Sequence, residues 1–378
     1  MRKELSSQRR TGLSKSPFPL SPFLPFSLSP FLPFPFPPFP LSPIPSLSAP
    51  RCLVPRRNIA YLDNSHPDKE VLMKVLVTDG ISADGAKILR DAGLTVDQMT
   101  LTPDQLLKTI GDYECILVRS ATKVTKDVID AGTKLKVIAR GGVGVDTIDV
   151  AQARAKNILV LNTPAASAIS VAELTIGHML AVSRFLHLSS MEMRQGKWPK
   201  KEYSKGFEVF GKTLGIIGLG NIGKEVARRA LALGMKVLAY DPPFTPMEFF
   251  VEITTKERLL SSSDFITLHI PLDKGHGPVI GKKEFATMKK GVVIINCARG
   301  GVVDQAALLD ALNDGTVAGA GIDVYEHEPP TDAEKSLINH PRVSASPHIG
   351  GSTVEAQARI GTEIALKVVK ALLGTQQD

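Results

Sequence analysis

The sequence predicts an α/β protein with two doubly wound parallel-sheet domains, preceded by a disordered N-terminal extension. From Met73 onward, short apolar runs alternate with helical patterns, which is typical of β-α-β units. The chain has 378 residues, which is more than one small hydrophobic core usually organises and suits two domains. One of the units contains a glycine-rich turn between a strand and a helix, as nucleotide-binding domains do.

The extension, residues 1–72, repeats Pro, Phe, Ser and Leu, and proline at this density excludes helices and central strands. No apolar run reaches the length of a membrane span, so we expect no membrane partner. The predicted compartment is the cytoplasm, with residues 1–72 as an over-extended gene start and Met73 as the true first residue. The alternative is a plastid or mitochondrion: the basic, serine-rich and acid-poor composition allows an organelle transit segment, although the prolines interrupt an amphipathic helix.

A first, smaller domain of flavodoxin-like type is expected to begin at Met73. Its strands are predicted at 74–77, from 96, and at 115–118, 136–139 and 158–161. Its helices are predicted at 83–92, 103–110 and 126–131. The helical pattern 170–187 should cross to the second domain, with Ser170 as its N-cap and Glu173 in the capping-box position.

The second domain contains the most informative stretch of the chain. The apolar run 213–217 is followed by Gly218-x-Gly220-x-x-Gly223, a helical pattern, and a second apolar run, 235–240, that ends in Asp241. This is the order of a Rossmann dinucleotide site, in which the helix N-terminus binds the pyrophosphate. Asp241 can accept hydrogen bonds from both ribose hydroxyls and would repel a 2′-phosphate, so the predicted cofactor is NAD.

Later segments complete both domains. Strands are expected at 265–269, 291–295, 318–324 and 343–345. The amphipathic helix 354–373 should return to the first domain. The predicted domains are therefore 73–169 with 348–378 for substrate binding, and 170–347 for NAD binding.

Charge and cysteine usage exclude several classes of protein. The net charge of +7 suggests nucleic acid, but much of the excess lies in the first sixty residues, where Glu4 is the only acid. The remaining basic residues are scattered, with few clustered aromatic residues, so no nucleic-acid groove is expected. The widely spaced Cys52, Cys115 and Cys297 form neither a disulfide framework nor a zinc site, and no metal is expected.

Three polar residues just after predicted strands are candidates for catalysis: Arg299, Glu328 and His348. Ligands of open parallel sheets bind at the carboxyl ends of the strands. A histidine can take a hydroxyl proton, and a carboxylate beside it favours the imidazolium. An arginine can hold a substrate carboxylate through two parallel bonds. With a nicotinamide as hydride acceptor, the set suits oxidation of a hydroxy acid.

Seven motifs extend this to a family resemblance, which covers the chain from Met73 to about Leu373. They are VRSATKVT (118–125), RGGVGVD (140–146), SVAELTIG (170–177), GKTLGIIGLGNIG (211–223), NCARGGVVD (296–304), GIDVYEHEPP (321–330) and SPHIGGSTVEAQ (346–357). The chain resembles the D-isomer-specific 2-hydroxyacid dehydrogenases, and among them those acting on 3-phosphoglycerate. The resemblance implies Arg299, Glu328 and His348 as the catalytic set, and oxidation of 3-phospho-D-glycerate to 3-phosphohydroxypyruvate in serine biosynthesis.

The resemblance also implies a cofactor and a substrate set. The cofactor set adds Asn221, Ile222, Cys297, Ala298 and Asp323 to the three glycines and Asp241. The substrate set comprises the basic residues Arg119, Lys123, Arg140 and Arg184 around a phosphorylated hydroxy acid, and Gly142, Val143 and Gly144, whose loop amides form an anion nest for its carboxylate. A homodimer or higher homo-oligomer, formed around the crossover helix, is implied as well.

Other functions and departures from the family pattern stay open. A glyoxylate or hydroxypyruvate reductase, or another D-2-hydroxyacid dehydrogenase, would keep the same catalytic residues; an NAD-sensing corepressor would use the fold for protein binding. Ser167 stands where an asparagine is usual, and the loop 242–259 looks short. The chain stops at Asp378, so no regulatory amino-acid-binding domain and no serine feedback are expected.

Overall fold

The computed structural model describes residues 73–242, 250–273 and 275–374. They lie in one compact unit of the chain, Pro67–Asp378. The predicted disorder of residues 1–72 concerns a segment outside the described residues.

The first sheet has five parallel strands in the order β2-β1-β3-β4-β5, which is the flavodoxin-like winding. The strands are β1 Lys74–Val77, β2 Thr95–Gln98, β3 Cys115–Val118, β4 Val137–Arg140 and β5 Leu159–Asn162. The connecting helices are α1 Ala83–Asp91, α2 Pro103–Thr109, α3 Lys126–Ala131 and α4 Val150–Ala155, with a 3₁₀ turn at Ile110–Asp112.

The second sheet has seven parallel strands in the order β12-β11-β10-β9-β6-β7-β8, with the reversal of strand order between β6 and β9 that marks a nucleotide-binding edge. The strands are β6 Thr213–Ile217, β7 Lys236–Tyr240, β8 Glu252–Ile253, β9 Phe265–Leu268, β10 Val292–Asn296, β11 Val317–Ile322 and β12 Val343–Ala345. The helices are α7 Asn221–Ala232, α8 Lys256–Ser262, α9 Lys282–Phe285, α10 Gln305–Asp314 and α11 Asp332–Ile338. The predicted fold class is confirmed.

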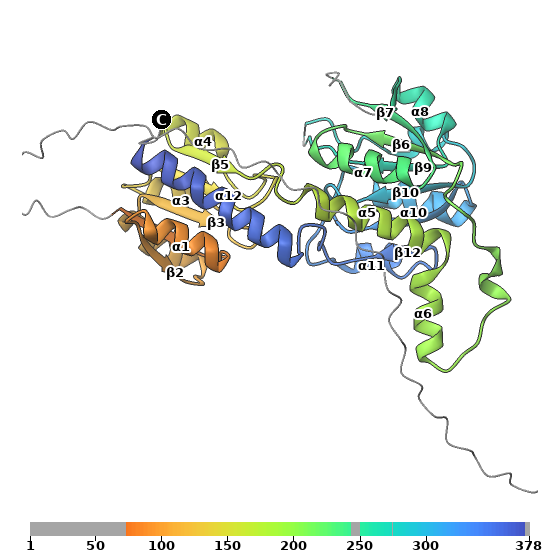
Figure 1. The fold of residues 1–378 in the computed structure, drawn as a ribbon, viewed down its shortest axis with the longest axis horizontal. Coiled ribbons are helices and arrows are strands. Elements are labelled where there is room, and N and C mark those ends of the chain that lie inside the picture. The colour runs from red at the N-terminus through yellow and green to blue at the C-terminus, as the bar shows by residue number, and fades with distance from the viewer. Residues whose placement is uncertain (1–72, 243–249, 274, 375–378) are drawn as a thin grey trace, which may run out of the picture. The chain divides into compact units, whose positions relative to one another are not determined.

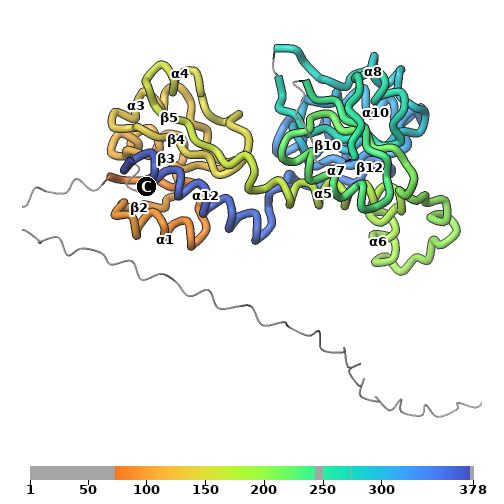
Figure 2. The backbone as a smooth tube through the Cα atoms, turned by 45° about the horizontal axis from the view of Figure 1, so that its top comes forward, coloured from red at the N-terminus to blue at the C-terminus, as the bar shows by residue number. Residues whose placement is uncertain are grey.

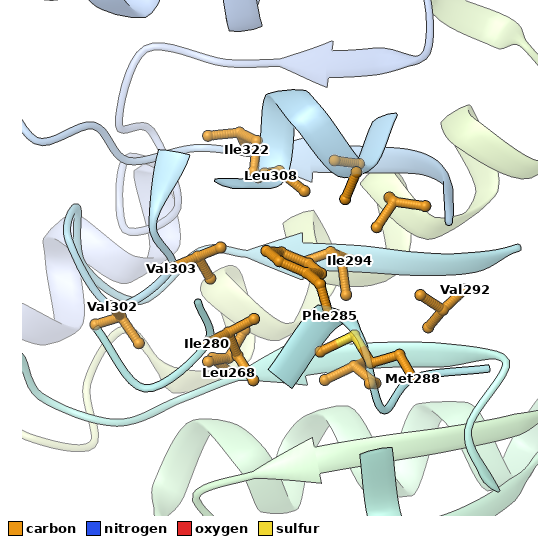
Figure 3. Close-up of a cluster of buried hydrophobic side chains, with 14 of the residues drawn as sticks. Leu268, Ile280, Phe285, Met288, Val292, Ile294, Val302, Val303, Leu308 and Ile322 are labelled. Atoms are coloured by element: carbon orange, nitrogen blue, oxygen red, sulfur yellow. The ribbon is translucent and has the colours of Figure 1, made fainter. Parts of the chain in front are cut away.

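Buried hydrophobic clusters pack against both sheets. Figure 3 shows one of them, in which Phe285 of α9 lies among Ile294 of β10 and Leu308 of α10. The continuous apolar runs of these strands, buried on both faces, are what a parallel sheet requires.

The C-terminal helix α12, Val354–Leu373, lies beside α1 and the five-stranded sheet (Figure 1). Its Ile364, Ala365 and Val368 share a buried cluster with Val75 and Leu89. The division into domains at the residue numbers given above stays a prediction.

The crossover differs from the expected single helix 170–187. It consists of α5, Ala168–Ser183, and α6, Leu186–Arg194, separated by a left-handed Phe185 (φ 55°), and a 3₁₀ turn follows at Glu202–Lys205. The bend can be followed in Figure 2. The Phe185 ring packs on Tyr203 at this break, with 5.7 Å between the ring centroids.

The expected cap of that helix is wrong. Ser167 is the N-cap, and Ser170 lies inside α5, where its Oγ donates to the Gly350 carbonyl at 2.6 Å. Glu173 accepts from Arg229 Nη2 at 3.0 Å. The segment 242–259 is also more ordered than the single loop expected, since β8 and the start of α8 lie within it; residues 243–249 are outside the described residues.

No single helix of the described residues has both the length and the apolar character to span a membrane. Taken together, α5 and α6 have the length and composition of a span, but they are bent by 69° relative to each other.

Candidate active site

A pocket of about 690 Å³ lies at the carboxyl ends of strands from both sheets. Residues just past β3, β4, β9, β10, β11 and β12 line it, as expected for open parallel sheets. They include the predicted catalytic residues Arg299, Glu328 and His348. The structure therefore brings these three, distant in sequence, to one pocket.

Glu328 and His348 form a hydrogen-bonded pair, with 2.6 Å between Glu328 Oε2 and His348 Nδ1. Both side chains are partly exposed, so the imidazole is accessible from the pocket. Burial raises the pKa of Glu328, but the hydrogen bond and charge of His348 outweigh it and hold that pKa below its ordinary value. The carboxylate is thus kept ionised beside the ring.

The loop carrying Glu328 is held from both sides. The amide of Tyr325 donates to Glu328 Oε1 at 3.2 Å. The neighbouring His327 bonds through Nδ1 to Glu334 Oε1 at 2.6 Å, and Glu334 also accepts from the amide of Thr331. These contacts fix the backbone around the carboxylate at the start of α11.

Arg299 follows β10, and its guanidinium has two fixed contacts. Its Nε donates to Asp146 Oδ2 at 2.9 Å, and its Nη1 donates to the Ala298 carbonyl at 2.7 Å. Asn296 shapes this turn, donating to the Arg299 carbonyl at 3.0 Å and accepting from the Ala298 amide at 3.1 Å.

Two further arginines, besides Arg299, line the pocket. Arg119 and Arg140 line it after β3 and β4, and in the described part of the chain the buried Nε of each has no hydrogen-bond partner. Burial, reinforced by the charge of Arg299, lowers the pKa of Arg140 to about 10. Two partly buried guanidinium groups, each with an unpaired Nε among the described residues, are chemically suited to an anionic ligand.

The predicted substrate residues divide into two groups. Gly142, Val143 and Gly144 line the pocket with Arg119 and Arg140. The Val143 carbonyl accepts from Asn162 Nδ2 at 2.6 Å, which holds the glycine loop. Lys123 and Arg184 are not among the lining residues. Arg184 follows α5, with its side chain beside Gly206.

The nucleotide turn lies between β6 and α7. Gly220 is the N-cap of α7 without a side-chain cap, which leaves the first amides of the helix, from Asn221 to Gly223, available to phosphate oxygens. Gly218 has a φ of +93°, and Asp241 directly follows β7. Ile222, Cys297, Ala298 and Asp323 line the same pocket as His348. These residues fit a dinucleotide, which supplies the hydride acceptor when bound.

Gly223 permits close approach of α7 to the turn. A Cβ at this position would lie 2.1 Å from the Gly218 carbonyl oxygen, so Gly223→Ala must push the helix away from β6. We expect the displaced helix to cost about 1–3 kcal/mol. If that cost falls on the NAD-bound state, the affinity for the cofactor drops roughly 5- to 150-fold, which a titration of NADH fluorescence measures. Gly177→Ala is the control, because no atom lies within 4 Å of the added carbon. An unchanged NADH affinity in Gly223→Ala would contradict this role.

The buried thiol of Cys297 is not poised for nucleophilic chemistry, since burial raises its pKa to about 12. Within residues 73–242, 250–273 and 275–374, no group of three or more His, Cys, Asp or Glu side chains could hold a metal ion.

Sequence reasoning missed several residues at the site. Asp146, which orients Arg299, ends the RGGVGVD motif, and Asn296 begins NCARGG, so both lay within recognised runs. His269 lines the pocket after β9, with Nε2 3.0 Å from Thr267 Oγ1; its place just after a buried strand was the available signal.

The sequence model of the D-isomer-specific 2-hydroxyacid dehydrogenase NAD-binding domain matches residues 176–350. A hydroxypyruvate reductase of Thermotoga maritima is 48% identical over 301 residues, covering 79% of this chain and 98% of that protein. The chain belongs to the D-isomer-specific 2-hydroxyacid dehydrogenase family. As a member, it is an NAD-dependent oxidoreductase, and the predictions of enzyme class and cofactor are confirmed.

Other family members are similar over the same region. D-3-phosphoglycerate dehydrogenases of Methanocaldococcus jannaschii and Rattus norvegicus are 46% and 45% identical, over 80% of this chain, which spans only 58% and 57% of their length. A solved glyoxylate reductase from Paecilomyes thermophila is 32% identical with a TM-score of 0.74, covering 80% of this chain and 95% of that one. D-lactate dehydrogenase from Aquifex aeolicus, solved with NAD and lactic acid, is 32% identical with a TM-score of 0.70, covering 79% and 95%.

Proposed function

We propose that the enzyme oxidises 3-phospho-D-glycerate at C2 to 3-phosphohydroxypyruvate, with NAD as the hydride acceptor. The observation that carries this proposal is the Glu328–His348 pair in a pocket shared with three arginines, Arg119, Arg140 and Arg299. A hydroxy acid bearing a carboxylate and a phosphate has the two anionic groups that such a pocket suits.

His348 accepts the C2 hydroxyl proton, and its Nε2 is the atom available, because Nδ1 bonds Glu328. Glu328 then stabilises the imidazolium through that bond at 2.6 Å. Arg299 binds the carboxylate and polarises the C2 oxygen. In the reverse direction His348 donates the same proton, so one site serves both oxidation and reduction.

The phosphate is assigned to Arg119 and Arg140. Their buried Nε groups without partners among the described residues would gain charge-assisted hydrogen bonds from phosphate oxygens. The amides of the Gly142–Gly144 loop, which lines the same pocket, are assigned to the substrate carboxylate as an anion nest. Lys123 and Arg184 remain in the predicted substrate set on family resemblance alone. With this substrate, the enzyme would act at the entry to serine biosynthesis.

The test of this assignment compares substrates and variants. We expect kcat/KM with NADH to be higher for phosphohydroxypyruvate than for hydroxypyruvate or glyoxylate, and Arg140→Gln to remove most of that preference. Loss of one charged hydrogen-bond donor is worth about 1.5–3 kcal/mol, or roughly 10- to 150-fold in kcat/KM on the phosphorylated acid. Activity of Arg140→Gln on hydroxypyruvate should change much less. An equal loss on both acids would contradict the phosphate assignment.

A second candidate is a hydroxypyruvate reductase. The Thermotoga maritima relative of that name is 48% identical over 301 residues. This reading keeps His348, Glu328 and Arg299 in their roles and makes Arg119 and Arg140 contacts for carboxylate only. Preference for unphosphorylated hydroxypyruvate in the same assay would select it.

We also propose a homodimer formed around α6. No residue of α6 is buried, and Leu186, Met191 and Met193 are about half exposed; Trp198, just beyond it, is 77% exposed. An apolar surface of this kind is typical of subunit interfaces. We expect Met191→Glu to shift the protein from dimer to monomer in sedimentation analysis, while Lys87→Glu on the exposed face of α1 does not. A wild-type protein that sediments as a monomer would contradict the proposal.

The compartment, cytoplasm or organelle, stays a prediction that depends on residues 1–72.

A further inference from the structure

A buried chain of polar groups lies beneath the loop that carries His348. His178 on α5 is only 4% exposed and has a serine oxygen 2.9 Å from each ring nitrogen: Ser344 at Nδ1 and Ser346 at Nε2. Ser346 Oγ in turn donates to Asp323 Oδ1 at 2.5 Å. The proposed reaction uses neither His178 nor the two serines.

Counting protons fixes the direction of every bond in this chain. Ser346 has one hydroxyl proton, which it gives to the Asp323 carboxylate, so its oxygen can only accept from His178 Nε2–H. Burial lowers the pKa of His178, which keeps the ring neutral. Nδ1 of a neutral ring that carries its proton on Nε2 must accept, so Ser344 is its donor. The ring is therefore a single tautomer, and all three bonds run from Ser344 to Asp323.

Asp323, the last group in this series of hydrogen bonds, holds the loop that carries His348. Asp323 Oδ1 and Oδ2 accept from the amides of Ile349 and Gly350 at 2.9 and 2.8 Å. The His348 amide donates to the Asp323 carbonyl at 2.8 Å. His348 itself has a φ of +52°, a left-handed conformation that a non-glycine residue adopts only where its surroundings hold it.

We propose that His178 is a positioning residue for the dehydrogenase reaction: through Ser346 and Asp323, it fixes the loop that presents the His348 imidazole to Glu328. The inference rests on the proposed role of His348 as proton acceptor. Each bond in a chain of this kind polarises the next, which strengthens the hold of Asp323 on the two loop amides. A second contact from the same helix, Ser170 Oγ to the Gly350 carbonyl at 2.6 Å, makes α5 the support of this loop.

The kinetic test uses His178→Leu and His178→Gln in the full-length protein, assayed with NADH and whichever of phosphohydroxypyruvate and hydroxypyruvate gives the higher kcat/KM. Leucine removes both hydrogen bonds of the ring. We expect kcat to fall about 10- to 100-fold, which is the range that a displacement of up to 1 Å at the reacting group produces. The KM for the oxo acid should change little. Glutamine retains one donor and one acceptor and should restore much of kcat. Ser183→Ala is the matched control, because the hydroxyl of this buried serine of α5 donates to the Met179 carbonyl of the same helix, at 2.6 Å. Unchanged kcat in His178→Leu would overturn the inference.

The stability of the loop that carries His348 is measured by amide hydrogen exchange in the absence of substrate. In His178→Leu we expect faster exchange at the amides of Ile349 and Gly350 and unchanged exchange in β1 and β3. In the wild type we expect the nitrogen NMR spectrum to show His178 as the Nε2–H tautomer. Acceleration throughout the protein, with no restoration by glutamine, would mean that His178 only stabilises the core and would overturn the inference. Because exchange needs no turnover, it distinguishes failure of this inference from failure of the proposed role of His348, which His348→Ala tests separately.

Discussion

Replacement of His348 by alanine is expected to lower kcat by about 10²- to 10⁴-fold, the range that a positioned general acid or base contributes. The proton acceptor is lost, and no other imidazole is bonded to Glu328 in the described residues to replace it. Substrate and NAD should still bind, because Arg299 and the α7 turn are untouched. The measurement is steady-state NADH formation from 3-phosphoglycerate, with NADH oxidation by phosphohydroxypyruvate for the reverse direction.

The matched control for this variant is His276→Ala. His276 is an exposed histidine that also pairs with a carboxylate, Asp273, at 2.7 Å, but it lies outside the pocket, so kcat should not change. Glu328→Gln should lie between the wild type and His348→Ala, because the base remains and loses the carboxylate that stabilises its charged form. Near-normal turnover in His348→Ala would contradict the assignment of the base.

The pairing of Glu328 with His348 shows what the sequence can predict. The two residues follow β11 and β12, which are adjacent parallel strands, so the rule that strand ends share one edge already placed them together. The same rule placed Arg299 after β10. The positions of the strands, the glycine turn and the final helix α12 were likewise readable from apolar periods and motifs, which are local properties of the sequence.

Other features depend on contacts between distant segments, and the sequence alone does not reveal them. Ser170 looks like an N-cap, but it lies inside α5, and its hydroxyl donates to the Gly350 carbonyl, from a loop 180 residues later. Phe185, at the break after α5, packs on Tyr203. The orientation of Arg299 by Asp146 joins side chains 153 residues apart. The basic residues Arg119, Lys123, Arg140 and Arg184 were equivalent candidates in the sequence, and only the geometry separates the two that line the pocket.

Replacement of Arg299 by alanine is expected to lower kcat/KM for the hydroxy acid by about 10²- to 10⁴-fold. Two hydrogen bonds to a carboxylate, each worth about 1.5–3 kcal/mol, would be lost together. Loss of substrate binding should raise KM, and loss of polarisation at the C2 oxygen should lower kcat. Arg90→Ala, which removes an exposed arginine at the end of α1, is the control and should leave both constants unchanged.

Arg299→Lys separates charge from geometry at the same position. Lysine keeps the positive charge but cannot form two parallel bonds to a carboxylate, nor bond Asp146 through an Nε donor. We expect it to recover part of the binding lost in Arg299→Ala while kcat stays low, because the polarising group is no longer fixed by Asp146 and the Ala298 carbonyl. Full recovery of kcat by lysine would mean that charge alone is needed, and that the contact with Asp146 has no part in catalysis. The comparison therefore tests whether the ion pair found in the structure orients Arg299 for the reaction or only neutralises it.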